Sequence, residues 1–563
     1  MRLVSRLPLA LLPLLVLGVA SFAEDRTDLS LAHQIKAEAF ERSKVMEHLS
    51  ALCDVHGPRL TGSPNFTTSC EWAAERLKTY GLSNVALETW GPFGRSWSYT
   101  RLRLDLVEPQ YARIRGFPLA WSAGTEKAIS SEPIVAAIER KRDPAKDKEE
   151  IAKFKAQWKG KLRGRVLLLT KPKAMPLPTN AAAKRLSAQE LSELAEAPMP
   201  SERKKFDYSK LEIPEDAAER GQYFQGAPAD LWEVLGKLRD ARNADLHAWL
   251  REEGVQACFV RDDRGEGGAV FGEAAGPYKS EHPLALPTFV LAHEDYDRLA
   301  RLVEGDKHPK VEIELAVKVS EKDQDGLNVI AEIPGDSKKD EVVMVGAHID
   351  SWVGGTGATD NGAGTAVAME VARILKALDL KLPRTVRIGL WGGEEQGLLG
   401  SRAYVAKHMG DDKSMKVTAE HGKLSVYFNL DNGTGKIRGV YLQGNDAARP
   451  HVKRWLEPFH DLGASTVTIR NTGGTDHLSF DAIGLPGFQF IQDPLDYGSR
   501  THHSDMDVYD HVQAGDLMQS AAIMAYCVAE AARMETLFPR KPMPRPRKSL
   551  EEMLPKETPP GVR

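Results

Sequence analysis

The sequence predicts an α/β protein whose largely parallel central sheet is flanked by helices, with a strand-rich domain inserted into the chain. Three observations support this fold class. From about residue 326 onward, apolar strand-like runs alternate with segments of helical periodicity, as they do where helices connect parallel strands. Between residues 110 and 320, charge-dense and proline-rich passages are punctuated by short strands. The chain of 563 residues is also long enough for roughly three domains, each with its own core.

Composition and charge exclude several classes of protein. Hydrophobic residues make up 42 % of the chain and charged residues 27 %, which is an ordinary globular mixture and not that of a fibrous or disordered protein. The 75 Lys and Arg residues nearly balance the 79 Asp and Glu residues, so the net charge is −4. A nearly balanced charge removes the electrostatic basis for binding nucleic acid or an anionic membrane surface.

The first residues have the layout of a secretory signal peptide. Arg2 and Arg6 precede an apolar stretch from Leu7 to Val19, and small residues follow up to Ala23. The apolar stretch is shorter than the ~20 residues that a transmembrane helix requires. We therefore expect residues 1–23 to be removed on export, which leaves a secreted or periplasmic protein with no membrane attachment. A signal anchor that is retained is the alternative.

Residues 24–109 are expected to form the N-terminal part of the catalytic domain. Their pattern is mostly helical from Leu29 to Leu82, interrupted by the turn G-P-R-L-T-G-S at residues 57–63, and strand-like near residues 85–88 and 102–107. Cys53 and Cys70 flank this turn. In an oxidising compartment they could form a short-loop disulfide or remain two separate buried thiols, and the sequence does not decide between these.

Residues 110–320 are expected to form the inserted domain. Its periodicity predicts one helix, residues 230–253. We find no cluster of residues suited to chemistry in it. The strands are expected at residues 165–169, 256–260, 288–291 and 311–319.

Residues 321–539 are expected to form the main part of the catalytic domain, and residues 540–563, rich in Pro, Lys and Arg, a disordered tail. The strands of the catalytic domain are Val-rich apolar runs, typical of strands buried on both faces of a sheet. Trp391 and Tyr404 are interpreted as packing residues. The expected strands are residues 341–347, 385–391 and 425–430, and the expected helices are residues 364–378, 398–408 and 446–462.

Side chains that can bind metal ions follow these strands. They are His348 and Asp350, Asp360 in a glycine-rich loop, Glu394 and Glu395, Asp431, and His502 and His503 near the C-terminus. Because ligands gather at the carboxyl ends of the strands in such sheets, we expect these side chains to converge. Imidazole and carboxylate ligands suit zinc, and cobalt or manganese could substitute for it. One carboxylate can bridge two ions roughly 3.5–4 Å apart, so two histidines, one bridging carboxylate and two terminal carboxylates would complete a two-metal site.

The order of these motifs resembles that of the co-catalytic two-zinc exopeptidases, which include secreted aminopeptidases and glutamate carboxypeptidases. The motifs are H-x-D, D-N-G-A-G, E-E-Q-G, an Asp at a strand end and H-S-x-x-D, between about residues 325 and 535. The turn at residues 57–63 is similar as well. The layout is most similar to the plasma glutamate carboxypeptidase type, and the insertion resembles a protease-associated domain.

The resemblance implies a role for each metal-binding position. His348 and His503 would be the terminal ligands of two zinc ions, Asp360 would bridge the ions, and Glu395 and Asp431 would complete the two coordination spheres. His503 is preferred to His502 because neighbouring side chains diverge and His503 begins the H-S-x-x-D motif. The resemblance also implies a cis peptide bond between Asp360 and Asn361, at a position where relatives often have Asp instead of Asn.

Four further residues have expected roles near the metals. Glu394 would be the general base, which accepts a proton from water and returns it to the leaving amine, although a helix-capping role is the alternative. Asp350 can accept the hydrogen of the far ring nitrogen of His348 and so hold its tautomer. Asp476 and His477 fall where relatives line the substrate pocket, and capping of a turn explains them equally well.

We therefore expect a secreted or periplasmic metallo-exopeptidase that removes terminal residues from short peptides. The sequence does not distinguish an aminopeptidase from a carboxypeptidase or a dipeptidase. The alternatives are another two-metal amidase, a glutaminyl cyclase on the same fold, or a receptor-like binding protein without metals. The filled ligand positions favour the enzyme. The resemblance also allows a homodimer, although no interface stripe is legible in the sequence.

Overall fold

The computed structural model describes residues 27–175, 177, 179, 181–200, 211–215, 219, 223, 229–265 and 267–546. The expected signal peptide, residues 1–23, lies outside the described residues, as do residues 547–563 of the expected tail. Among the helices that the structure describes, none combines the length and apolarity needed to cross a bilayer.

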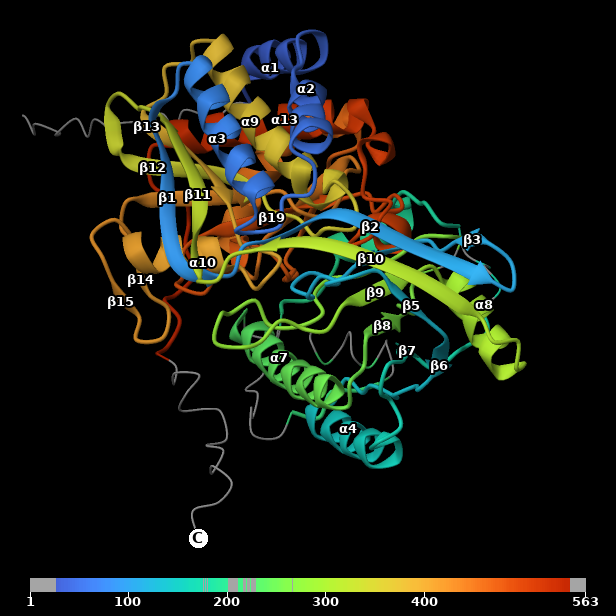
Figure 1. Ribbon diagram of the computed structural model, residues 1–563. Helices are drawn as coiled ribbons and strands as arrows, with labels where there is room; N and C mark the ends of the chain where they lie inside the picture. The colour runs from blue at the N-terminus through green and yellow to red at the C-terminus, as the bar shows by residue number, and fades with distance from the viewer. Residues whose placement is uncertain are drawn as a thin grey trace, which may run out of the picture.

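An eight-stranded sheet forms the centre of the part of the molecule that carries the predicted metal-binding motifs (Figure 1). The strands β13, β12, β16 and β19 in its middle run parallel to one another, whereas β11 pairs antiparallel with β1 and β13, and β17 pairs antiparallel with β19 and parallel with β18. This confirms the predicted α/β class. In spatial order the strands are β1 (Ser83–Gly94), β11 (Gln324–Ile333), β13 (Arg384–Trp391), β12 (Lys338–His348), β16 (Leu424–Asn429), β19 (Gly487–Gln492), β17 (Ile437–Tyr441) and β18 (Thr466–Thr468).

Both faces of the central sheet are buried. Successive side chains of a strand point to opposite faces, so Val343 and Val345 join one core cluster while Met344 joins another. On the Met344 face, Trp391 and Tyr404 are buried in the same cluster, which confirms their packing role. The helices that contribute to the Val343 face are α1 (Leu29–Glu41), α2 (Val45–Ser50), α3 (Pro64–Thr79), α9 (Ala363–Ala377), α11 (Arg449–Leu456) and α13 (Ala514–Arg533). The Met344 face is covered by α10 (Leu399–His408) and α12 (His477–Asp481).

Two further sheets carry the inserted part. The four-stranded sheet has the order β3 (Ala112–Arg113), β2 (Trp97–Glu108), β10 (Lys310–Val319) and β5 (Ile129–Ser131). The five-stranded sheet has the order β4 (Gly116–Pro118), β9 (Thr288–Leu291), β8 (Ala257–Val260), β7 (Val166–Leu168) and β6 (Pro133–Val135). The two sheets share a buried cluster that includes Leu104, Ile313 and Phe289. Figure 1 shows the long β2–β10 pair running from the central sheet past these smaller strands, with α4 (Pro144–Trp158), α7 (Ala229–Glu252) and α8 (His293–Glu304) around them.

The prediction of one continuous helix over residues 446–462 is wrong. The α-helix α11 covers only Arg449–Leu456, and short 3-10 turns occupy Asp446–Ala448 and Glu457–Leu462. Pro458 explains the break, because it donates no backbone hydrogen bond and its ring clashes with the carbonyl group four residues earlier. The helix α4 also occupies a charge-dense stretch in which no element was predicted. Asp143 caps its N-terminus, because its carboxylate accepts the amide hydrogens of Ala145 and Lys146.

All four cysteines are free and buried. Cys53 lies in the helical turn Ala51–Val55, and Cys70 lies in α3. Of the two alternatives that the sequence left open for this pair, the structure therefore has the separate buried thiols. Burial also raises the pKa of the Cys53 thiol to about 12, as expected of a packed thiol that does not react.

Candidate metal centre

The predicted metal-binding residues from the strand ends converge at one edge of the central sheet. His348 is the last residue of β12, and Asp431 follows the end of β16 by two residues. Asp360 lies in the helical turn Ala358–Gly362 that precedes α9. The Nε2 atom of His348 lies 3.3 Å from Asp360 Oδ1 and 3.3 Å from Asp431 Oδ1. These three groups form the first half of the centre.

The second half shares Asp360 with the first. His503 Nε2 lies 3.2 Å from the other carboxylate oxygen of Asp360, Oδ2, and 3.1 Å from Glu395 Oε2. Glu395 follows β13, so it reaches the centre from the strand beside β12. Asp360 therefore presents one oxygen to each of two histidine–carboxylate pairs, which is the arrangement expected of a bridging ligand.

The neighbouring residue His502 lies close to this half. Its ring stacks on that of His503 at a centroid distance of 3.8 Å, and its Nε2 atom lies 3.7 Å from Asp360 Oδ2. His503 makes the shorter approach to Asp360 and also approaches Glu395, which His502 does not among the ion pairs of the described residues. The geometry therefore favours His503 as the ligand.

Buried atoms without hydrogen-bond partners show that the cluster fits metal ions. His348 Nε2, Asp360 Oδ2, Glu395 Oε1 and Asp431 Oδ1 are all buried, and none of them has a hydrogen-bond partner among the described residues. Burying polar and charged groups in this way is costly unless they are paired or coordinate a cation. A cavity of about 10 Å³ is lined by Asp360, Glu395 and His503 among others, which is room for roughly one water or small ion.

The electrostatics of the cluster lead to the same conclusion. Burial raises the pKa of Glu395 to about 8, and it raises the pKa of Glu394 well above its usual range. Burial would lower the pKa of His348, but the charges of Asp431 and Glu394 raise it well above the ordinary value. The cluster thus contains more negative charge than its buried surroundings can stabilise, and divalent cations would supply the missing positive charge.

The loop that carries Asp360 is held by several hydrogen bonds. The peptide bond between Asp360 and Asn361 is cis, as the family resemblance implied. The side-chain amide of Asn361 donates to the carbonyl oxygen of Leu430 at 2.9 Å and accepts from the amide of Gly364 at 2.9 Å. An aspartate carboxylate could not make the first of these bonds, so Asn361 links the Asp360 loop to the strand that leads to Asp431.

Asp350 connects the two strand ends. Its carboxylate accepts the backbone amide hydrogens of Glu394 at 3.2 Å and Glu395 at 3.3 Å. The Nδ1 atom of His348 lies 3.1 Å from the carbonyl oxygen of Asp350 and 3.5 Å from its carboxylate. The backbone of Asp350 therefore makes the closer contact with the ring, and the carboxylate mainly positions the segment that carries Glu394 and Glu395.

The turn at residues 57–63 supports the centre from the N-terminal part. Arg59 is fully buried and donates hydrogen bonds to backbone carbonyl groups, including those of Ile349 at 2.6 Å and Thr356 at 2.7 Å. Thr61 donates to the Asp350 carboxylate at 2.9 Å and accepts from the amide of Gly393 at 3.0 Å. The sequence analysis recognised this motif without assigning a role to either residue.

Two acidic residues that received no role from the sequence also contact the centre. Asp507, the last residue of the H-S-x-x-D motif, accepts the backbone amide hydrogens of Thr359 at 2.5 Å and Asp360 at 3.3 Å. Glu273 Oε1 forms a hydrogen bond with His503 Nδ1 at 2.8 Å. Glu273 belongs to the insertion, where we expected no residue suited to chemistry. The place of Asp507 at the end of the H-S-x-x-D motif is a signal that could have identified it, whereas nothing in the local sequence points to Glu273.

The two residues predicted to contact substrate are as deeply buried as the metal ligand His348. Asp476 and His477 are both fully buried at the start of α12. The ring of His477 lies 3.3 Å from the carbonyl oxygen of Thr472, and burial lowers its pKa to about 4. Burial raises the pKa of Asp476 to about 7, while the charge of His348 opposes this shift. Asp476 therefore interacts electrostatically with His348 of the centre, whereas His477 has a hydrogen-bond partner in the backbone of Thr472.

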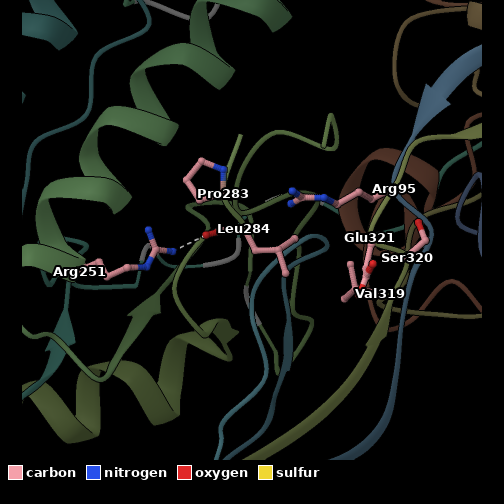
Figure 2. Close-up of a pocket in the computed structure, with 7 residues that line it drawn as sticks. All are labelled: Arg95, Arg251, Pro283, Leu284, Val319, Ser320 and Glu321. Atoms are coloured by element: carbon pink, nitrogen blue, oxygen red, sulfur yellow. Dashed lines mark hydrogen bonds between the residues drawn. The ribbon is translucent and has the colours of Figure 1, made fainter. Parts of the chain in front are cut away.

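A larger surface hollow lies elsewhere in the molecule (Figure 2). It has a volume of about 530 Å³ and is lined by residues of the β1–β2 connection, α7, the end of β10 and the loop before β9. Its two arginines already have partners, since Arg95 donates to the carbonyl oxygen of Ser280 at 2.8 Å and Arg251 to that of Leu284 at 2.5 Å. None of the metal-centre residues lines this hollow.

Comparison with known proteins gives consistent results. Residues 328–528 match the sequence profile of peptidase family M28. The chain is 25 % identical over 501 residues to carboxypeptidase Q from Bos taurus, which covers 89 % of this chain and 87 % of the relative. It is 31 % identical over 257 residues to carboxypeptidase Q from Mus musculus, which covers 45 % of this chain and 52 % of the relative. The matched part of the chain thus spans about half the length of the mouse relative.

Among solved structures, a peptidase M28 precursor from Shewanella amazonensis SB2B has a similar fold. The TM-score is 0.62 at 22 % sequence identity, and the match covers 92 % of this chain and 98 % of that chain. At this level of identity the likeness concerns the fold, and it includes the inserted part as well as the central sheet because nearly the whole chain is covered.

Proposed function

We propose that the chain is a zinc-dependent exopeptidase that hydrolyses terminal peptide bonds of short peptides, because residues 328–528 match the profile of peptidase family M28. The observation that carries this proposal is the position of Asp360 between two histidine–carboxylate pairs. In a binding protein without metals, these buried ligand atoms would lack hydrogen-bond partners and so would destabilise the fold, which argues against that alternative.

Two zinc ions are the proposed cofactors. His348 and Asp431 would hold one ion and His503 and Glu395 the other, with Asp360 shared between them. Cobalt or manganese could take the same positions because the ligands are nitrogen and oxygen atoms only. When bound, the pair of ions would lower the pKa of a shared water and polarise the carbonyl group of the scissile bond.

Glu394 is the proposed general base. Glu394 is buried, and its Oε2 atom lies 3.9 Å from His348 Nε2, farther than the 3.3 Å of the ligands Asp360 and Asp431. Burial raises the pKa of Glu394 well above its ordinary value, which strengthens the carboxylate as a proton acceptor. It would accept the proton of the attacking water and then return it to the leaving amine. The hydrogen bonds from the backbone amides of Glu394 and Glu395 to the Asp350 carboxylate hold this segment in place.

We also propose that the protein acts outside the cytoplasm. The N-terminal layout of two arginines, an apolar stretch and small residues supports export. A peptide is the proposed substrate, and the proposal leaves open which terminus is recognised.

Profiling of a defined pool of short peptides by mass spectrometry tests the function. Wild-type protein should shorten peptides from one end only, and Glu394→Ala should lose roughly 10²–10⁴-fold in rate. Glu71→Ala, at an exposed position of α3, is the matched control and should keep the wild-type rate. Cuts within peptides would contradict the exopeptidase proposal. Conversion of N-terminal glutamine to a cyclic product, with no hydrolysis, would favour a cyclase instead.

A further inference from the structure

We propose that Glu273 of the inserted domain is a positioning residue for the metal ligand His503. This inference rests on the proposed two-metal function. The insertion would then do more than cover the catalytic part, because it would supply the group that sets the orientation and tautomer of one metal ligand.

The contact between the two side chains is short and well placed. Glu273 Oε1 lies 2.8 Å from His503 Nδ1, while His503 Nε2 on the opposite side of the ring faces Asp360 and Glu395. A histidine that binds a metal through one nitrogen commonly donates the hydrogen of its other nitrogen to a carboxylate or carbonyl oxygen, which fixes the ring and makes it a better ligand. Glu273 is placed for this role.

Backbone contacts hold Glu273 at this distance. The amide of Gly272 donates to the carbonyl oxygen of His503 at 3.0 Å, and Phe271 forms an antiparallel bridge with Ser504. The amide of Val270 donates to Asp505 Oδ1 at 2.8 Å, and the amide of Asp505 donates back to the carbonyl oxygen of Val270 at 3.0 Å. Residues 270–273 therefore lie along residues 503–505 as a short strand would.

These contacts also bear on the backbone of His503. His503 has a φ of +63°, in the left-handed region that side chains other than glycine rarely occupy. A residue in this region keeps its conformation only when its surroundings determine it. The bonds from the insertion to His503 and to the two residues after it supply that constraint.

The insertion also holds the other end of the loop that carries His503. Arg185 donates to Asp493 at 2.9 Å, and the amide of Leu186 donates to the other oxygen of Asp493 at 2.9 Å. The amide of Lys184 donates to the carbonyl oxygen of Leu495 at 3.0 Å. The segment between Asp493 and Asp505 is thus bonded to the insertion near both of its ends.

The two metal-binding histidines differ in the origin of their support. His348 Nδ1 faces the carbonyl oxygen of Asp350, two residues away in the catalytic part. His503 Nδ1 faces a residue that is 230 positions away and belongs to the insertion. Arg239 of α7, also in the insertion, donates a hydrogen bond at 3.5 Å to Glu273 Oε2, the carboxylate oxygen that does not contact His503. Loss of Glu273 should therefore weaken one metal site and not the other.

The test compares zinc binding in full-length variants. Glu273→Ala removes the contact, Glu273→Gln keeps an acceptor oxygen without the charge, and Glu139→Ala is the matched control, because it removes an exposed carboxylate of the insertion that pairs with Lys141. Zinc affinity is measured by competition with a chromophoric chelator, and the thermal unfolding midpoint of each metal-loaded variant is measured in parallel.

We expect wild type to bind two zinc ions, and Glu273→Ala to bind one of them about 10–100-fold more weakly, since this is the usual effect of removing such a partner. Glu273→Gln should give a smaller loss at the same site, and it decides the matter if the alanine variant does not fold. Glu139→Ala should keep both zinc affinities within about twofold of wild type.

Two results would overturn the inference. If wild type binds two zinc ions and both Glu273 variants bind them equally well, Glu273 only docks the insertion, and the proposed function is unaffected. If wild type binds fewer than two zinc ions, the proposed function fails together with this inference.

Discussion

The hydroxyl group of Thr61 donates a hydrogen bond to Asp350 Oδ2 at 2.9 Å and so joins the N-terminal turn to the end of β12, 289 residues further along the chain. The same oxygen of Thr61 accepts the amide hydrogen of Gly393. One small side chain therefore connects the segment after β12 to the segment after β13, which carries Glu394 and Glu395.

Thr61→Val should test this connection, because valine has the same shape without the hydroxyl group. The buried Asp350 carboxylate and the Gly393 amide would each lose a partner, so we expect a loss of about 1–3 kcal/mol in the free energy of unfolding and a lower peptidase rate. Chemical denaturation and steady-state kinetics measure the two effects. Thr68→Val, at an exposed position of α3, is the control. Equal stability of the two variants would show that the connection contributes little.

Asp360→Asn should reduce the metal content of the protein. Asparagine offers one carboxamide oxygen where aspartate offers two, so it cannot face both histidines as a ligand. We expect about one zinc ion per chain in the variant against two in wild type, and loss of peptidase activity, with zinc counted by plasma mass spectrometry. Asp379→Asn, an exposed substitution, should keep both ions. A variant with two tightly bound ions would refute the bridging role of Asp360.

Gly364→Ala should disturb the centre through packing alone. A Cβ atom at Gly364 would lie 2.3 Å from the carbonyl oxygen of Leu430, the residue before Asp431. We expect a loss of about 1–3 kcal/mol in the free energy of unfolding, as for other overpacked sites, together with weaker zinc binding. At Gly515 in α13 nothing lies within 4 Å of the added Cβ atom, so Gly515→Ala should be stabilising by about 0.5–1 kcal/mol. Thermal and chemical denaturation of both variants compare the two positions, and a neutral Gly364→Ala would contradict the close approach.

Acid should destabilise the protein through its buried histidines. Burial lowers the pKa of His48 to about 4, while an unfolded histidine titrates near 6.5. The folded state therefore binds fewer protons than the unfolded state between these two pH values. The contribution of neutral His48 to the free energy of unfolding is fully present above about pH 6.5, and it is lost as the pH falls toward 4. His48 alone accounts for about 3 kcal/mol of this loss.

His48→Gln should flatten the dependence of unfolding free energy on pH between 6.5 and 4. Burial also lowers the pKa of His247 to about 4, so part of the dependence should persist in the variant. Replacement of the exposed His33 by Gln is the control, and urea denaturation at a series of pH values is the measurement. A variant with the same slope as wild type would show that His48 does not titrate in this range.

Much of the fold could be predicted because its signals are local. Strands β9 and β13 and helix α9 occur within one residue of their expected positions, since a buried strand or an amphipathic helix is marked by the periodicity of its own residues. The helix over residues 446–462 failed because the pattern of apolar residues continues across Pro458, where the helical hydrogen bonds cannot. The antiparallel edges of the central sheet were also not predicted, because strand direction depends on the path of the connections and not on the residues of the strand.

The same distinction applies to the metal centre. By itself, the sequence determined which residue types stand at the strand ends and in what order, and these alone specify a site made of imidazole and carboxylate groups. Only the tertiary structure decided which oxygen of Asp360 faces which histidine, that Thr61 and Asp507 hold the loops, and that Glu273 reaches His503 from the insertion. Such partners are single hydrogen bonds between segments far apart in the chain, so they leave no periodic pattern and exist only once the sheets have been brought together.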